Sequence, residues 1–116
     1  MLTAATVLPF GAEWPTVPIM PAPLSPAEIA AALETLPGWA LDGDRLAKTF
    51  VFQNFPEAFS FMTRVAFAAE ALDHHPDWSN VYNRVTVRLN THDAGGAITE
   101  KDLRLARAIQ GISWVS

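Results

Sequence analysis

A long uninterrupted helical segment limits what this chain can fold into more than any other feature of its sequence. No glycine or proline occurs from Glu57 to His75, and the preceding Asn54-Phe55-Pro56-Glu57 has the pattern of a helix start, with a capping asparagine and a glutamate that can reach back to the cap. Its apolar residues form two faces: Ala58, Phe59, Met62, Ala66 and Ala69 on one, and Phe61, Val65, Ala68 and Leu72 on the other. A single sheet covers one face only, so we expect another subunit to cover the second.

The residues before this segment predict a shorter helix followed by a hairpin. Ser25-Pro26-Ala27-Glu28 combines an N-cap serine, a proline at the first helical position and a capping-box glutamate. We therefore expect a helix over residues 26–36, ended by Pro37-Gly38. Two β-prone runs, 39–41 and 45–52, flank Asp42-Gly43-Asp44, whose glycine supplies the positive φ that a tight hairpin turn requires.

The residues after the long helix predict a second hairpin and a last helix. Strands are expected from Trp78 to Tyr82 and from Val85 to Leu89, with a turn at Asn83-Arg84. Thr99 to Asp102 has the capping pattern that opens a helix. The order helix, two strands, helix, two strands, helix predicts an α+β fold in which three helices cover one face of a four-stranded antiparallel sheet.

Residues 24–116 are expected to form a single domain, because a chain of 116 residues is too short for two ordinary ones. Residues 1–23 hold five of the nine prolines and show no helical or strand period. This proline-rich arm is expected either to be disordered or to dock through Phe10, Trp14, Val17 and Ile19, and the sequence favours neither.

Composition excludes several classes of function. A net charge of −4 gives no general attraction to phosphate backbones or anionic lipid, so neither nucleic acid nor membrane is expected as a partner. The absence of cysteine rules out disulfides, thiol nucleophiles and zinc-thiolate sites. No lysine or arginine precedes Arg45 and no apolar run is long enough to span a bilayer, which favours a cytoplasmic protein.

The three histidines are the candidate chemical groups. His74 and His75 adjoin at the end of the predicted long helix, and His92 follows the last predicted strand. Histidine exchanges a proton near neutral pH, since its unperturbed pKa is about 6.5. Glu70 precedes His74 by four residues, so on a helix the carboxylate would orient that imidazole, whereas His75 precedes Pro76 and should leave the helix in another direction.

Roles without catalysis, and different chemistries, also fit some of these residues. A histidine at a helix C-terminus favourably meets the helix dipole without any catalysis, and Asp102 is accounted for as a capping carboxylate. Metal binding is disfavoured because two neighbouring imidazoles that diverge do not converge on one ion and no HExxH motif is present, so no metal is expected. A serine hydrolase is disfavoured because the chain has no Gly-x-Ser-x-Gly motif.

An ordered set of motifs over residues 25–116 resembles the pterin-4a-carbinolamine dehydratase family. The residues that carry the resemblance are Phe61-Met62-Thr63-Arg64-Val65-Ala66, Glu70, Leu72-Asp73-His74-His75-Pro76-Asp77-Trp78, Asn80-Val81-Tyr82-Asn83 and Thr91-His92-Asp93. The chain departs from the family pattern in its loop 94–98, which is one residue longer.

The resemblance implies an activity and roles for individual residues. The implied reaction is the dehydration of 4a-hydroxytetrahydropterin to quinonoid dihydropterin and water, in tetrahydrobiopterin recycling, with no cofactor. His74 and His92 would be the acid and base, with His75 also in the catalytic set and linked to pterin binding. The implied pocket lining is Glu70, Asp73, Pro76, Thr91 and Asp102.

The resemblance also implies partners. Family members assemble as dimers or tetramers, and we expect a homodimer or homotetramer formed through the long helix. Animal members also act as dimerisation cofactors for a homeodomain transcription factor. A non-catalytic dimerisation cofactor or pterin-binding module is therefore the alternative to an enzyme.

Overall fold

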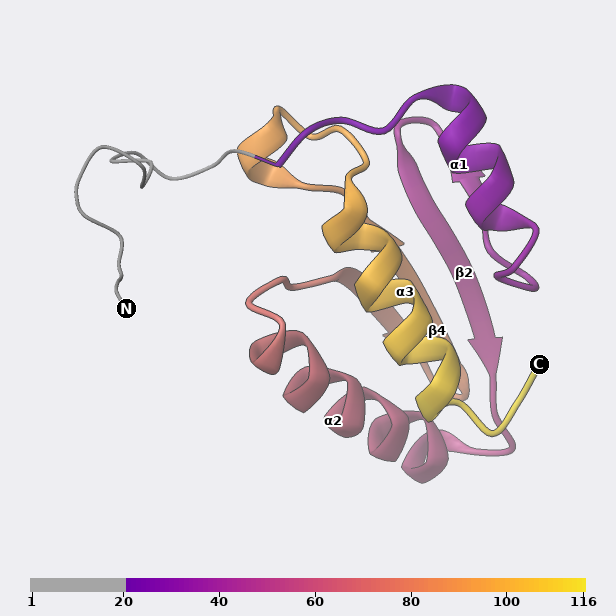
Figure 1. The fold of residues 1–116 in the computed structure, drawn as a ribbon. Helices are drawn as coiled ribbons and strands as arrows, with labels where there is room; N and C mark the ends of the chain where they lie inside the picture. Colours follow the sequence, from indigo (N-terminus) through magenta and orange to yellow (C-terminus); the bar gives the residue numbers. More distant parts are fainter. Residues whose placement is uncertain (1–20) are drawn as a thin grey trace, which may run out of the picture.

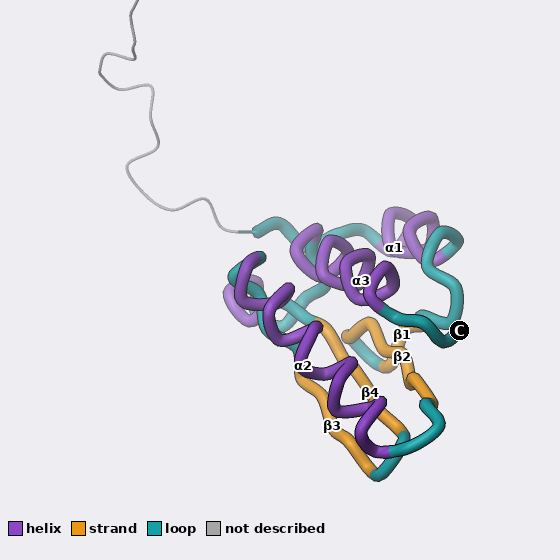
Figure 2. Tube along the Cα trace, turned by 90° about the horizontal axis from the view of Figure 1, so that it is seen from below, coloured by secondary structure: helices purple, strands orange, loops and turns teal. Residues whose placement is uncertain are grey.

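The fold of this protein, obtained as a computed structural model that describes residues 21–116, is a four-stranded antiparallel sheet with three helices on one face (Figures 1 and 2). The arm residues proposed for docking lie outside the described part. Along the chain the elements are α1 (Pro26–Leu33), β1 (Ala40–Asp42), β2 (Arg45–Val51), α2 (Phe55–Ala71), β3 (Asp77–Val81), β4 (Arg84–Leu89), a 3₁₀ turn η1 (His92–Ala94) and α3 (Glu100–Ile112). The strand order is β1-β2-β4-β3, and the predicted α+β class and element order are confirmed.

Each helix begins at the residue that the capping patterns predict. The Ser25 hydroxyl accepts a hydrogen bond from the Glu28 amide at 3.1 Å at the start of α1. The Asn54 side chain accepts one from the Glu57 amide at 2.9 Å at the start of α2. At the start of α3, Thr99 and Asp102 form a reciprocal capping box. These caps satisfy backbone N–H groups that have no partner within the helix, which is why short local patterns fix where helices start.

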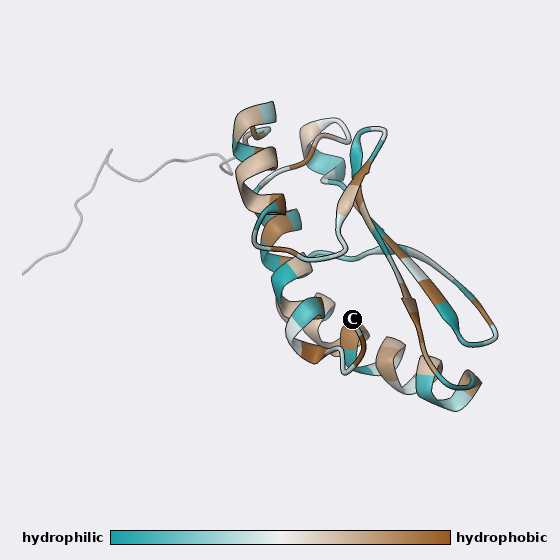
Figure 3. Cartoon of the chain, turned by 90° about the vertical axis from the view of Figure 1, so that its right-hand side faces the viewer, coloured by the Kyte–Doolittle hydropathy of each residue, from teal (hydrophilic) through white to brown (hydrophobic). Residues whose placement is uncertain are grey.

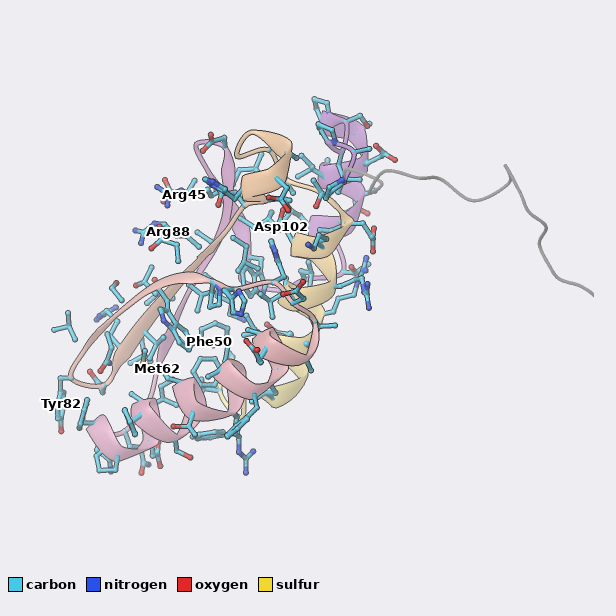
Figure 4. The ribbon with its side chains drawn as sticks, turned by 90° about the vertical axis from the view of Figure 1, so that its left-hand side faces the viewer. Arg45, Phe50, Met62, Tyr82, Arg88 and Asp102 are labelled. Carbon is cyan, nitrogen blue, oxygen red and sulfur yellow. The ribbon has the colours of Figure 1, made fainter. Side chains whose placement is uncertain are left out.

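The sheet separates an apolar face from a polar one. Leu46, Phe50, Val85, Val87 and Leu89 are buried beneath the helices. Their neighbours along the strands point to the other face, and apolar and polar colours alternate along the strands in Figure 3. Figure 4 shows Arg45 and Arg88 pointing away from the helices and Phe50 lying between the sheet and α2. Across the open face Arg45 pairs with Asp77 and Arg88 with Asp42.

The faces of α2 differ from the predicted grouping. Ala58, Phe61, Val65 and Ala69 are buried together against the sheet, so Ala58 and Ala69 belong with Phe61 and not with Phe59. The prediction assigned to each face residues that lie too far apart around the helix axis. The other apolar face is exposed in the single chain, with Phe59 at 59% and Phe67 at 75% exposure.

Element ends also differ from the prediction by a few residues. Helix α1 ends at Leu33, and the chain continues to Leu36 in tighter i to i−3 turns. The turn of the second hairpin is Tyr82-Asn83 instead of Asn83-Arg84, because Val81 pairs with Arg84. Tyr82 takes a φ of 52°, the left-handed conformation that two-residue hairpins demand at this position.

Lys48 is a buried cation on the helix-facing side of β2. Its ammonium donates to the Pro37 carbonyl at 2.8 Å and to the Gln110 side-chain oxygen at 2.9 Å, and it lies 4.8 Å from the centre of the Phe50 ring. Within residues 21–116 it makes no ion pair. Desolvation by burial lowers the pKa of Lys48 below its usual value of 10.5.

Because the pKa of Lys48 is lowered, we expect the free energy of unfolding to rise at alkaline pH. The variant Lys48→Met should lack this rise. Between the folded-state pKa and 10.5 the unfolded chain binds the lysine proton more than the folded chain does, so the free energy of unfolding rises with pH in that window. We expect the wild-type value to rise relative to that of the variant as pH increases toward 10.5, when urea unfolding is measured at several pH values. Parallel pH curves for the two proteins would contradict this account of Lys48.

Candidate active site

The chain turns sharply after α2, and this turn separates the two neighbouring histidines. The amide of Asp73 donates to the Glu70 carbonyl at 3.1 Å and the amide of His74 to the Ala69 carbonyl at 3.0 Å. These two bonds are a Schellman motif, with Asp73 in the left-handed conformation at a φ of 53°. Helix α2 therefore ends before the histidines, at Ala71.

The predicted pairing of Glu70 with His74 is wrong, because that pairing required the helix to continue. The Glu70 carboxylate instead meets the Nε2 atom of His75 at 2.9 Å, and both side chains are exposed. His74 turns in the opposite direction, into the protein. Adjacent histidines thus have different environments, one solvated and one buried.

A cleft of about 320 Å³ opens where four parts of the chain meet: the turn after α2, the start of β3, the segment after β4 and the first turn of α3. All three histidines line it. The complete lining is Asp73, His74, His75, Pro76, Asp77, Asn90, Thr91, His92, Asp93 and Lys101. Its volume lies within the range of roughly 300–1,000 Å³ that small-molecule sites occupy.

His74 is the buried histidine of this cleft. Its side chain is only 8% exposed, and its Nε2 atom lies 2.6 Å from the Oδ1 atom of Asp102, which is fully buried at the start of α3. Figure 4 shows Asp102 on this helix. A carboxylate that accepts one ring N–H of a histidine holds the ring's orientation and tautomer.

Two threonines hold the other oxygen of Asp102. The Oδ2 atom accepts hydrogen bonds from the Thr91 hydroxyl and from the Thr99 amide, each at 2.8 Å. The two threonine hydroxyls lie 2.7 Å apart, and both side chains are buried. Both oxygens of the buried carboxylate therefore have partners, which is the condition for a buried charge to be tolerated.

The structure brings six of the eight predicted site residues to the cleft: Asp73, His74, His75, Pro76, Thr91 and His92. Glu70 and Asp102 are outside its lining and contact it through a histidine, Glu70 through His75 and Asp102 through His74. Asp102 combines its capping function with this contact, so the longer loop 94–98 does not displace it. Its catalytic or binding role, like that of the other residues, stays a prediction.

Sequence reasoning did not assign a site role to four residues of the lining: Asp77, Asn90, Asp93 and Lys101. Asn90 and Asp93 flank Thr91-His92, so their position beside a candidate histidine was the available signal. Thr99 was interpreted only as a helix cap. Its contact with Thr91 depends on how α3 packs beside the end of β4, which local sequence patterns do not specify.

Three carboxylates and one ammonium give the lining a negative balance when the histidines are neutral. Asp77 is paired with Arg45, whereas Asp73 and Asp93 are exposed and make no side-chain hydrogen bond or ion pair within residues 21–116. No group of three or more histidine, aspartate or glutamate side chains in the described part of the chain is arranged to hold a metal ion. None of the described helices is long and apolar enough to cross a membrane.

Comparisons with known proteins identify the family of this chain. The family model described as pterin 4 alpha carbinolamine dehydratase matches residues 22–112. A relative from Opitutus terrae is 59% identical over 96 residues, covering 83% of this chain and 99% of the relative. One from Mesorhizobium japonicum is 60% identical over 86 residues, covering 72% and 87%. Both are named provisionally as pterin-4-alpha-carbinolamine dehydratases.

A solved structure shows the same fold. The crystal structure of a transcriptional coactivator/pterin dehydratase from Brucella melitensis superposes with a TM-score of 0.74 at 43% identity, covering 78% of this chain and 98% of that one. The family model covers most of the chain, and the matched residues include the whole cleft lining. The chain belongs to the pterin-4a-carbinolamine dehydratase family.

Proposed function

We propose that this protein dehydrates 4a-hydroxytetrahydropterin to quinonoid dihydropterin and water by histidine acid/base catalysis. The observation that carries the proposal is the grouping of His74, His75 and His92 around one cleft, with His74 held by a buried carboxylate. Membership of the dehydratase family gives the reaction class.

The reaction requires a proton donor and a proton acceptor in one site. The C4a–O bond breaks and the hydroxyl leaves as water after taking a proton, while N5 loses its proton and the C4a=N5 double bond forms. A correctly placed acid or base contributes on the order of 10²–10⁴ in rate. Two of the three histidines can supply these functions, with His74 and His92 as the proposed acid and base and His75 as the residue that holds the pterin.

The charge of the cleft suits the substrate and its transition state. The pterin ring presents N–H groups along its aminopyrimidine edge, and the unpaired carboxylates of Asp73 and Asp93 can accept hydrogen bonds from them. Departure of the hydroxyl before the N5 proton leaves positive charge on the ring. A negatively charged lining stabilises that charge as it develops.

A dehydration assay with the purified protein tests the proposal. Carbinolamine formed by an aromatic amino acid hydroxylase is followed by absorbance as it converts to quinonoid dihydropterin, with and without the chain. We expect the protein to accelerate this conversion above its spontaneous rate. A rate that does not change with protein concentration would refute the proposed activity.

We place this activity in the recycling of tetrahydropterin cofactors in the cytoplasm. The product of the reaction is an oxidised dihydropterin, so a reductase must follow it, and a pterin-dependent hydroxylase must supply the substrate. The place in recycling follows from the chemistry of substrate and product.

We further propose that the exposed face of α2 joins copies of this chain into a homodimer or homotetramer. A groove of about 280 Å³ on this face is lined by Phe59, Met62, Thr63, Ala66, Phe67 and Trp78 and offers almost no polar surface. Soluble monomers rarely expose a contiguous apolar surface of this kind. A second α2 helix has a complementary apolar face, as an isologous interface requires.

Phe59→Glu is expected to shift the protein to monomers, because the interface would bury an uncompensated charge. Light scattering after size-exclusion chromatography would give a mass near that of the single chain, 12.6 kDa, for the variant and a multiple of it for the wild type. Leu41→Glu is the matched control, since Leu41 is an exposed apolar residue on β1, outside the groove. Equal masses for Phe59→Glu and wild type would exclude this surface as the interface.

A non-catalytic dimerisation cofactor is the second candidate function. The neighbour from Brucella melitensis carries both descriptions, coactivator and dehydratase, and the same α2 surface could pair with another protein. The complete histidine cleft favours the enzyme, since a scaffold has no need of it. A protein that is inactive in the dehydration assay but forms mixed oligomers would support the scaffold.

A further inference from the structure

His92 is held in place differently from the other two histidines of the cleft. The Nε2 atom of His75 meets the Glu70 carboxylate at 2.9 Å, and that of His74 meets the Asp102 carboxylate at 2.6 Å. The His92 side chain is exposed and makes no hydrogen bond or ion pair with any other residue that the structure describes. Its position therefore depends on the backbone that carries it.

The backbone around His92 forms a closed loop. Thr91 donates its amide to the Ala97 carbonyl at 2.9 Å, and its own carbonyl accepts from the Gly96 amide at 3.0 Å. Gly95 and Gly96 have φ values of 70° and 87°, in the left-handed region where a Cβ atom causes strain. These two glycines let the chain return to Thr91 directly after the 3₁₀ turn that contains His92.

Leu24 holds this loop from outside the cleft. Its amide donates to the carbonyl of Ile98 at 2.9 Å, one residue beyond the bridge between Thr91 and Ala97. Figure 1 shows the indigo start of the described chain beside the orange segment that follows β4. Ile98 is buried, and a buried carbonyl that loses its partner is costly. The bond therefore restrains the end of the loop.

Leu24 is itself anchored to the body of the protein. It directly precedes Ser25, whose capping box begins α1. The Leu24 side chain packs against the hydrophobic core, as do the side chains of Ile29 and Leu33 on α1. Because the donor of the hydrogen bond is anchored in this way, α1 and the core restrain the loop that carries His92.

We infer that the backbone amide of Leu24 positions His92 for proton transfer, by holding its loop through the Ile98 carbonyl. The inference rests on the proposed function, in which His92 is one of the two proton-transfer groups. Leu24 is a positioning residue, since it does not line the cleft. A misplacement of about 1 Å in a reacting group can cost on the order of 10² in rate, so a hydrogen bond outside the cleft can affect the reaction.

Leu24→Pro removes the donor, because proline has no amide hydrogen and its ring occupies the place of the lost hydrogen. We expect kcat for dehydration to fall on the order of 10-fold with KM little changed, since His92 is not proposed to hold the pterin. Leu24→Ala retains the amide and should keep most of the rate. Ala22→Pro is the matched proline control, since Ala22 is exposed and its amide makes no hydrogen bond in the described chain.

A double-mutant cycle with His92→Gln separates positioning from a general loss of stability. If Leu24 acts through His92, Leu24→Pro should have no further effect on kcat in a protein that already lacks this imidazole. An equal loss of rate from Leu24→Pro with and without His92 would overturn the inference. So would a wild-type rate in Leu24→Pro, or an equal loss in Ala22→Pro.

Hydrogen exchange followed by NMR tests the same bond in the full-length wild-type protein, without substrate. We expect the amides of Leu24 and Thr91 to be protected to a similar degree, because opening of the loop exposes both. A Leu24 amide that exchanges freely while the Thr91 amide stays protected would overturn the inference, even if Leu24→Pro does not fold. A wild-type protein without dehydratase activity would overturn the proposed function, and the exchange rates would still decide whether Leu24 holds the loop.

Discussion

His74→Gln is expected to lower kcat for carbinolamine dehydration by about 10²–10⁴-fold while the protein remains folded. The glutamine amide can still donate to Asp102, so the buried carboxylate keeps a partner and the variant avoids the cost of an unpaired buried charge. What it lacks is a group that exchanges a proton near neutral pH. Stopped-flow absorbance at saturating substrate measures kcat directly.

The other two histidines provide the comparison for this result. His92→Gln should also reduce kcat strongly if His92 is the second proton-transfer group. His75→Asn should act mainly on KM, because this exposed residue is proposed to hold the pterin. Circular dichroism spectra that match the wild type would show that the fold is retained. Wild-type kcat in both His74→Gln and His92→Gln would remove the two residues from the mechanism.

Phe61→Ala is expected to lower the free energy of unfolding by about 3–5 kcal/mol, as large aromatic deletions from a packed core do. Phe61 is fully buried on the inner face of α2. The centre of its ring lies 4.8 Å from that of Phe50 and 4.9 Å from that of Phe52, with Trp114 at 6.4 Å. Such a loss is a large fraction of the stability of a small domain.

Phe67→Ala is the matched control, since it deletes the same side chain from the same helix at a position 75% exposed in the single chain. Urea unfolding should be measured at one fixed, low protein concentration, because assembly through α2 would add stability that depends on concentration. We expect Phe67→Ala to change stability by much less than Phe61→Ala when the protein is monomeric. Equal losses would mean that the two faces of α2 are not distinct.

Much of the fold could be predicted from the sequence because its causes are local. Ser25, Asn54 and Thr99 each begin a helix by satisfying backbone N–H groups two or three residues further on. Gly43 allows the first hairpin turn, and alternation along β4 shows which side chains enter the core. These interactions span a few residues, so a short stretch of sequence contains both partners.

The candidate site also has a part that could be predicted from the sequence and a part that could not. The motifs around His74-His75-Pro76 and Thr91-His92 identified the histidines and the family from the sequence, and six of the eight predicted residues line the cleft. The partner of each histidine was not predictable in this way. A continuous helix would have placed Glu70 beside His74, whereas the left-handed turn at Asp73 brings Glu70 to His75.

The sequence by itself determined the helix starts, the alternation of the strands, the element order and the candidate proton-transfer groups, since each depends on neighbours along the chain. Only the tertiary structure decided the partner of His74. That partner is Asp102, 28 residues away, and it depends on the packing of α3 beside the end of β4, where two threonines contact the carboxylate. Contacts between distant segments are set by how the whole core packs, and no local pattern encodes them.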